Sequence, residues 1–89
     1  MSLLLISVSQ NENMFSVFPN PSEGNIEIRF EHLVASASIQ IYNLLGAVYS
    51  ESLNNNQHSK QIHLDVPPGI YFIKIETGET IITKRLIIQ

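Results

Sequence analysis

The sequence of 89 residues contains no cysteine. This absence excludes disulfide bonds and thiolate metal sites, so a small scaffold stapled by disulfides is excluded as well. It leaves the compartment open, because a domain that folds without oxidation can also be exported. The length is sufficient for one domain with a single apolar core of modest stability.

Positive charge is also scarce. Five lysines and arginines stand against eight aspartates and glutamates, which gives a formal net charge of -3. Nucleic-acid modules usually carry a basic patch, so this balance argues against a nucleic-acid partner. No apolar run approaches the roughly 20 residues that a membrane-spanning helix needs, and we expect no membrane insertion.

The first residues have only some of the features of a signal peptide. Met1–Val8 is apolar, but it is short and lacks a basic start and a clear cleavage site. We interpret residues 1–13 as a linker, an expression remnant or a short strand, and residues 14–89 as the folded domain. On this interpretation the chain is a fragment of a longer protein, which N-terminal sequencing of the native protein would test.

What the sequence does contain is a series of short β-type segments rich in isoleucine. The strongest is residues 69–75, which joins aromatic and β-branched side chains and places Tyr71, Ile73 and Ile75 on one face. The predicted strands are residues 14–18, 26–30, 37–42, 47–53, 60–65, 69–75 and 80–88. Residues 31–35 and 54–59 are expected to form loops.

Turn signals separate these segments. Pro19–Asn25 is dense in turn residues, Asn43–Gly46 has Asn and Gly at the favoured positions, and Gly78 lies in the last turn. The sequence therefore has about seven strands, turn signals roughly every 8–12 residues and no helical periodicity. This pattern predicts an all-β fold, an antiparallel β-sandwich of immunoglobulin-like type.

Residue types capable of catalysis or metal binding are few and dispersed. His32, His58 and His63 are the only histidines, and the last two would point to opposite faces of a continuous strand. A zinc site needs three or four converging ligands. The sequence has no Gly-x-Ser-x-Gly nucleophile elbow, and its four glycines occur singly at turns. We expect no catalytic residue, no metal and no cofactor.

The final strand differs from the others because it is apolar on both faces, at Ile81-Ile82 and at Leu86-Ile87-Ile88. A half-exposed strand should alternate. It is either a central strand, a strand whose second face is covered by loops, or an edge kept apolar for a partner. The last option includes an edge-strand dimer, with Lys84 and Arg85 acting against aggregation.

A different class of function remains open. Tyr42, Tyr49 and Phe72 could form an exposed platform for a carbohydrate or a protein, as in an accessory binding module of a cell-surface protein. Core positions and single exposed aromatics explain the same residues. A structural spacer in a cell-surface protein is a further alternative.

Four segments occur in order along the chain. They are Phe18-Pro19-Asn20-Pro21 with Gly24 following, Ile39-x-Ile41-Tyr42-Asn43-x-x-Gly46, Gly69-Ile70-Tyr71-Phe72-Ile73-Lys74-Ile75, and Lys84 in the final apolar strand. Over roughly residues 15–89 they resemble the C-terminal sorting domain of the type IX (Por) secretion system of Bacteroidetes, in the subtype usually called type A. Residues 65–68 depart from the family, whose members often have a leucine and a small residue there.

The resemblance implies a β-sandwich appended to a larger secreted protein. The cargo would enter the periplasm by a separate N-terminal signal, and the outer-membrane machinery of the system would recognise the domain. In the family, a sortase-like cysteine peptidase commonly removes the domain, and the cargo reaches the cell surface or the medium, in some cases joined to an anionic lipopolysaccharide. The domain would be a substrate and not an enzyme.

The resemblance also assigns candidate sorting residues. They are Pro19, Asn20, Pro21, Gly24, Gly46, Gly69, Tyr71, Lys74, Lys84, Leu86, Ile87 and Ile88. Gly69 is expected to shape the turn and Tyr71 to anchor the core. Lys84 and the end of the chain are expected to contact the machinery.

Overall fold

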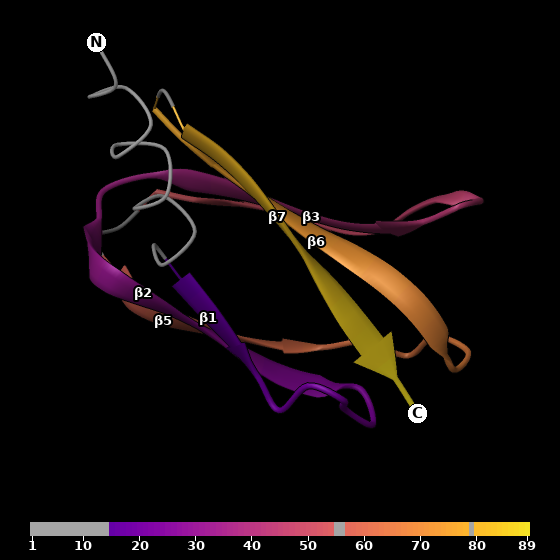
Figure 1. The fold of residues 1–89 in the computed structure, drawn as a ribbon. Helices are drawn as coiled ribbons and strands as arrows, with labels where there is room; N and C mark the ends of the chain where they lie inside the picture. The colour runs from indigo at the N-terminus through magenta and orange to yellow at the C-terminus, as the bar shows by residue number, and fades with distance from the viewer. Residues whose placement is uncertain (1–14, 55–56, 79) are drawn as a thin grey trace, which may run out of the picture.

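The computed structural model describes residues 15–54, 57–78 and 80–89, all in strands and their connections (Figure 1). The strands are β1 (Phe15–Phe18), β2 (Asn25–Val34), β3 (Ala37–Asn43), β4 (Gly46–Leu53), β5 (Gln57–His63), β6 (Gly69–Thr77) and β7 (Thr80–Ile88). The interpretation of residues 1–13 concerns a part of the chain that lies outside the described residues.

The strands form two antiparallel sheets. One has the order β1-β2-β5 and the other the order β4-β3-β6-β7. The connections β2–β3, β4–β5 and β5–β6 cross between the sheets, whereas β3–β4 and β6–β7 are hairpins. The predicted all-β, immunoglobulin-like sandwich of seven strands is therefore confirmed. Figure 1 shows the end of β7 beside the loop that joins β1 to β2.

The alternation of side chains in the sequence determines which face of each strand is buried. In β2, Ile26, Ile28 and Phe30 point into the core, while Arg29 between them is exposed. In β6, the predicted inner residues Tyr71, Ile73 and Ile75 are all at most 2 % exposed. The apolar faces of the two sheets pack on each other, which is the packing expected of a sandwich.

Two predicted loops are wrong in part. β2 continues through residues 31–34, because a register shift between Arg29 and Val34 absorbs the break in alternation and lets Val34 pair with Gln57. β5 begins at Gln57, so residues 57–59 belong to the strand. Ser59 pairs with Arg29, and its polar side chain is compatible with a strand position because it faces outward. Residues 55–56 lie outside the described residues.

The final strand is not central. β7 is the edge of the four-stranded sheet and pairs with β6 alone. Its even-numbered residues face the opposite sheet, so Ile82 and Leu86 are buried. Ile81, on the other face, is 59 % exposed. The double-sided apolar pattern thus belongs to an edge strand with a partly open outer face.

Charged side chains connect the two sheets at both edges of the sandwich. On the β4–β5 side, Lys60 Nζ lies 2.9 Å from Glu51 Oε2, and the Tyr49 hydroxyl donates to Glu51. On the β1–β7 side, the Lys84 ammonium donates to the carbonyl oxygen of Phe15 and lies 4.7 Å from the centroid of the Phe15 ring. Each bridge joins one sheet to the other.

The bridge at Glu51 predicts an acid-sensitive contribution to stability. The hydrogen bond from Tyr49, and then Lys60, hold the pKa of Glu51 below its ordinary value. A carboxylate with a lowered pKa stabilises the fold above its unfolded pKa, and this contribution is lost as the pH falls through the folded pKa. Glu51→Gln should therefore lower the free energy of unfolding by about 0.5 kcal/mol near neutral pH and by less in acid.

Urea denaturation at neutral and acidic pH measures this difference. Glu76→Gln is the matched control, since Glu76 is an exposed carboxylate without an ion pair in the described residues. An equal loss for Glu51→Gln at both pH values would contradict a role for the ionised bridge.

Candidate functional site

The β1–β2 loop lies against the C-terminal half of β7, although the two are 65 to 67 residues apart in sequence. The Asn20 side chain donates from Nδ2 to the carbonyl oxygen of Arg85 at 2.9 Å. Its Oδ1 accepts from the amide of Ile87 at 3.0 Å. Pro19 and Pro21, both preceded by cis peptide bonds, flank it. The Asn20 amide thus takes the place of a neighbouring strand.

Ser22 continues this contact with its backbone. Its amide donates to the carbonyl oxygen of Ile87 at 2.9 Å, and its carbonyl oxygen accepts from the amide of Gln89 at 2.7 Å. Asn20 and Ser22 together form hydrogen bonds with four backbone groups of residues 85–89 that point away from β6, at the open edge of the sheet. We call this contact, of Asn20 and Ser22 with residues 85–89, the C-terminal clamp.

Hydrogen bonds of Ser22 and Gly24 fix the conformation of the β1–β2 loop that forms the clamp. The Ser22 hydroxyl, in a residue only 2 % exposed, accepts from the Gly24 amide and donates to the Asn25 carbonyl oxygen. The Gly24 carbonyl oxygen accepts from the amide of Leu64 at 2.8 Å. Leu64 follows β5, so the loop is bonded to both sheets.

Gly24 is the position in this loop where glycine is required. Its φ of +127° lies in the region that side chains disfavour, and a Cβ there would lie 2.7 Å from the carbonyl oxygen of Leu64. By contrast, Gly69 begins β6 without a positive φ, and a Cβ there would only contact the Tyr71 ring at 3.8 Å. The expected dependence of the turn on Gly69 is therefore not found.

The other side of β7 pairs with β6 at sorting residues. Gly69 pairs with Ile88, and Tyr71 pairs with Leu86. Tyr71 is buried, and its hydroxyl donates to the carbonyl oxygen of Pro67 at 2.6 Å. This is the tyrosine corner of immunoglobulin-like sandwiches, which fixes the turn before the strand.

The end of β7 is less accessible than the sequence suggests. Leu86 and Ile88 are 0 % and 3 % exposed and belong to the core, because even-numbered residues of β7 face the other sheet. Lys84 shares this face and is half-buried against Phe15. Ile87 is the sorting residue of this strand that points outward, and it is half-buried.

Two sorting residues lie apart from the clamp. Lys74 is on the outer face of the four-stranded sheet, between Gln40 of β3 and Thr83 of β7. Gly46, with a φ of +136°, lies in the β3–β4 hairpin, where the side chain of Asn43 accepts from the amide of Leu45 at 2.8 Å. The structure thus groups most of the predicted sorting residues around the C-terminal half of β7. Lys74 lies beside the middle of β7, and Gly46 lies in the hairpin of the same sheet.

The three aromatic residues considered as a platform do not lie together. Tyr42 and Phe72 are neighbours on the outer face, with ring centroids 5.9 Å apart. Tyr49 is on the opposite face and is bonded to Glu51. Burial, and then Glu51, raise the pKa of Tyr49 to about 12, as expected of a phenol that donates to a carboxylate.

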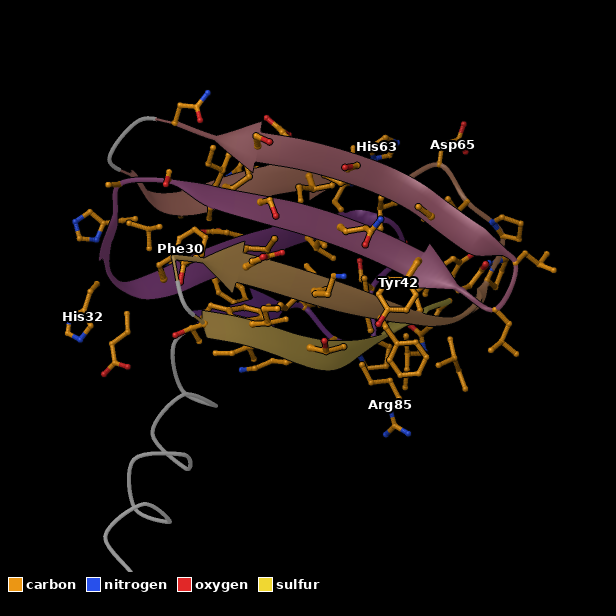
Figure 2. The ribbon with its side chains drawn as sticks, turned by 90° about the horizontal axis from the view of Figure 1, so that it is seen from above. Phe30, His32, Tyr42, His63, Asp65 and Arg85 are labelled. Atoms are coloured by element: carbon orange, nitrogen blue, oxygen red, sulfur yellow. The ribbon has the colours of Figure 1, made fainter. Side chains whose placement is uncertain are left out.

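No group of three or more potential ligands that could hold a metal ion occurs in residues 15–54, 57–78 and 80–89. His63 instead contacts Asn25, with 2.6 Å between Nδ1 and Oδ1. His32 lies at the opposite end of the molecule from His63 (Figure 2). Within the same ranges, no helix is long and apolar enough to cross a membrane.

Sequence reasoning missed the role of Ser22 and of Phe15. A serine two residues before a glycine is a signal for a side-chain-stabilised turn, and it could have identified Ser22. The partner of Lys84 is the backbone carbonyl of Phe15, which has no signal in the sequence.

The geometry at Gly24 predicts a strong effect of a single methyl group. Gly24→Ala should lower the free energy of unfolding by about 2 kcal/mol or more, because it adds both φ strain and a backbone clash. Gly69→Ala is the control and should change stability by less than about 0.5 kcal/mol. Urea denaturation measures both, and equal effects would contradict the assigned geometry.

The clamp predicts local protection of the end of the chain. Asn20→Ala should speed hydrogen exchange of the Ile87 amide about fivefold, because a net hydrogen bond contributes about 1 kcal/mol. The Ile73 amide in β6 should be unaffected. Asn43→Ala, which removes a side-chain hydrogen bond at the β3–β4 hairpin, is the control. Unchanged exchange at Ile87 in the Asn20 variant would show that the clamp does not hold β7.

Comparison with known proteins identifies the family of the chain. The family model of the secretion system C-terminal sorting domain matches residues 16–89, which includes both sides of the clamp. A search of curated proteins found no match. The chain therefore belongs to the family of C-terminal sorting domains, the sorting signals that the type IX secretion machinery recognises for export.

Proposed function

We propose that the clamp presents the end of β7 to the secretion machinery in one fixed conformation. The observation that supports this most directly is the convergence of the sorting residues. Asn20 bonds to residues 85 and 87 from one side of β7, while Gly69 and Tyr71 pair with Ile88 and Leu86 from the other. A strand held in this way has lost its conformational freedom before it binds, which lowers the cost of recognition.

On this proposal the sorting residues have two kinds of role. Asn20, Gly24, Tyr71 and Lys84 act through β7, because their contacts are made within the domain. Lys74, on the outer face of the same sheet, is available to a partner. The machinery would therefore contact the surface that β6 and β7 share and not the buried side chains.

Family membership supports the remaining steps of the proposal. The domain would be carried at the end of a larger cargo, which passes through the periplasm and reaches the cell surface or the medium. A sortase-like cysteine peptidase of the machinery would remove the domain. The domain would act as the substrate of this system and not as a catalyst, and it would need no cofactor.

The clamp also restricts where β7 could pair with another strand. From Arg85 onward its outer edge is occupied by Asn20 and Ser22. An edge-strand dimer stays a prediction, and it would have to use the part of β7 before Arg85.

Secretion of a reporter tests the proposal. The reporter carries an N-terminal signal peptide and is followed by residues 1–89, in a host with a type IX system. Removal of residues 86–89 should leave the reporter in the periplasm, because it removes two core side chains and one half of the clamp. Cell fractionation and surface labelling measure the distribution, and normal surface delivery of the truncated form would refute the proposal.

A second variant separates recognition from loss of the fold. Asn20→Ala keeps the core and should reduce surface delivery about fivefold through the loosened clamp. Asn43→Ala removes a side chain of the same kind whose hydrogen bond lies within the β3–β4 hairpin and not on β7, and it should be delivered normally. Equal delivery of the two variants would show that the clamp has no part in sorting.

A further inference from the structure

The positively charged side chains differ in whether they have an ion-pair or hydrogen-bond partner within the domain. Arg29 lies 3.1 Å from Glu27, Lys60 bonds to Glu51, and Lys84 bonds to the Phe15 carbonyl oxygen. The other two cationic side chains, Lys74 and Arg85, make no ion pair or hydrogen bond within the described residues. These two charges are therefore free to meet a partner.

Lys74 and Arg85 lie on the same surface. Tyr42, Phe72 and Arg85 occupy one row across β3, β6 and β7, in which each residue pairs with the next. Lys74 is two residues beyond Phe72 on β6 and therefore points to the same face. Figure 2 shows Tyr42 and Arg85 close together. The two cations thus flank Phe72 on the outer face of the four-stranded sheet.

Apolar side chains adjoin the two cations on this surface. Ile70, which is 57 % exposed, pairs with the half-buried Ile87 on the row next to Phe72. Phe72 and Tyr42 are in ring contact. We call this surface the outer patch: Tyr42, Ile70, Phe72, Lys74, Arg85 and Ile87. Glu76 is the one carboxylate farther along the same face of β6, and it forms no ion pair with Lys74.

We infer that the outer patch docks onto a protein surface that is apolar at its centre and acidic at its rim. This inference rests on the proposed function, since the partner would be part of the recognising machinery. Free cations beside an aromatic pair, on a chain of net charge -3, give this face a charge opposite to that of the whole domain. Such a face would attract an acidic partner in one orientation.

The apolar residues of the outer patch favour a protein over a polysaccharide. Saccharide sites use flat aromatic rings, whereas Ile70 and Ile87 have branched side chains that fill pockets. Aromatic residues and arginine are also enriched in the centres of protein interfaces. The partner is therefore expected to bury Phe72 and the isoleucines and to pair carboxylates with Lys74 and Arg85.

Two double variants with the same change in net charge test whether Lys74 and Arg85 contribute to docking through their charge. Lys74→Gln with Arg85→Gln removes the free cations of the outer patch. The control, Ser16→Glu with Ser59→Glu, places the same change on exposed positions beside Arg29 on the three-stranded sheet. In the reporter assay the first should lower surface delivery about tenfold, and the control should be delivered normally.

Thermal unfolding of both purified double variants checks the fold, and their melting temperatures should remain close to that of the parent chain. A folded Lys74/Arg85 variant that is delivered normally would overturn the inference. Failure of the parent chain to deliver the reporter would instead overturn the proposed function, so the two failures can be distinguished.

Crosslinking identifies the class of partner, and the cysteine-free sequence makes it selective. Thr83→Cys, on the exposed outer face beside Lys74, is labelled with a photoreactive maleimide and mixed with detergent-solubilised outer membranes of a type IX-competent strain. Gln61→Cys, exposed on the other sheet, is the control site.

The expected adduct joins Thr83→Cys to an acid-rich peptide of a second protein. It should be lost in the Lys74/Arg85 variant and at high salt, because salt screens charge pairs at a surface. An adduct with saccharide alone, an adduct with a second copy of this chain, or equal labelling from the control site would each overturn the inference.

Discussion

The outer edge of β7 imposes the constraint on which the rest of the domain depends. An edge strand exposes backbone groups that must bond to water, to another strand or to a substitute. Here Asn20 and Ser22 are the substitute, and they bond to residues 85–89 in place of a neighbouring strand. Ser22 and Gly24 in turn fix the loop to the second sheet. One short loop therefore closes the sheet edge and joins the two layers of the sandwich.

On the proposed function, this closure would direct recognition to a face of the sheet and away from its edge. Since residues 85–89 already have their backbone partners, a second strand cannot be added there without displacing the loop. The inner face of β7 is occupied as well, because Leu86 and Ile88 are in the core and Lys84 is bonded to Phe15. The outer face, with free charges at Lys74 and Arg85, is what remains accessible on this part of the domain.

The fold could be predicted from the sequence because period-two alternation and turn residues are local signals. They placed Ile26, Ile28 and Tyr71 correctly in the core. The bulge that extends β2 and the edge position of β7 could not be predicted, since both depend on pairing between distant strands. For the same reason Asn20 and Lys84 could be predicted as sorting residues from the family resemblance, but their partners could not, because these are backbone atoms far away along the chain.

The central claim, that the β1–β2 loop holds the end of β7 by hydrogen bonds, can be tested directly by nuclear magnetic resonance. Scalar couplings across hydrogen bonds report such contacts in solution without any mutation. The clamp predicts a coupling from the Ser22 amide nitrogen to the Ile87 carbonyl carbon, and one from the Gln89 amide nitrogen to the Ser22 carbonyl carbon. Absence of both couplings, with amides of Ser22 and Gln89 that exchange as fast as in an unstructured peptide, would contradict it.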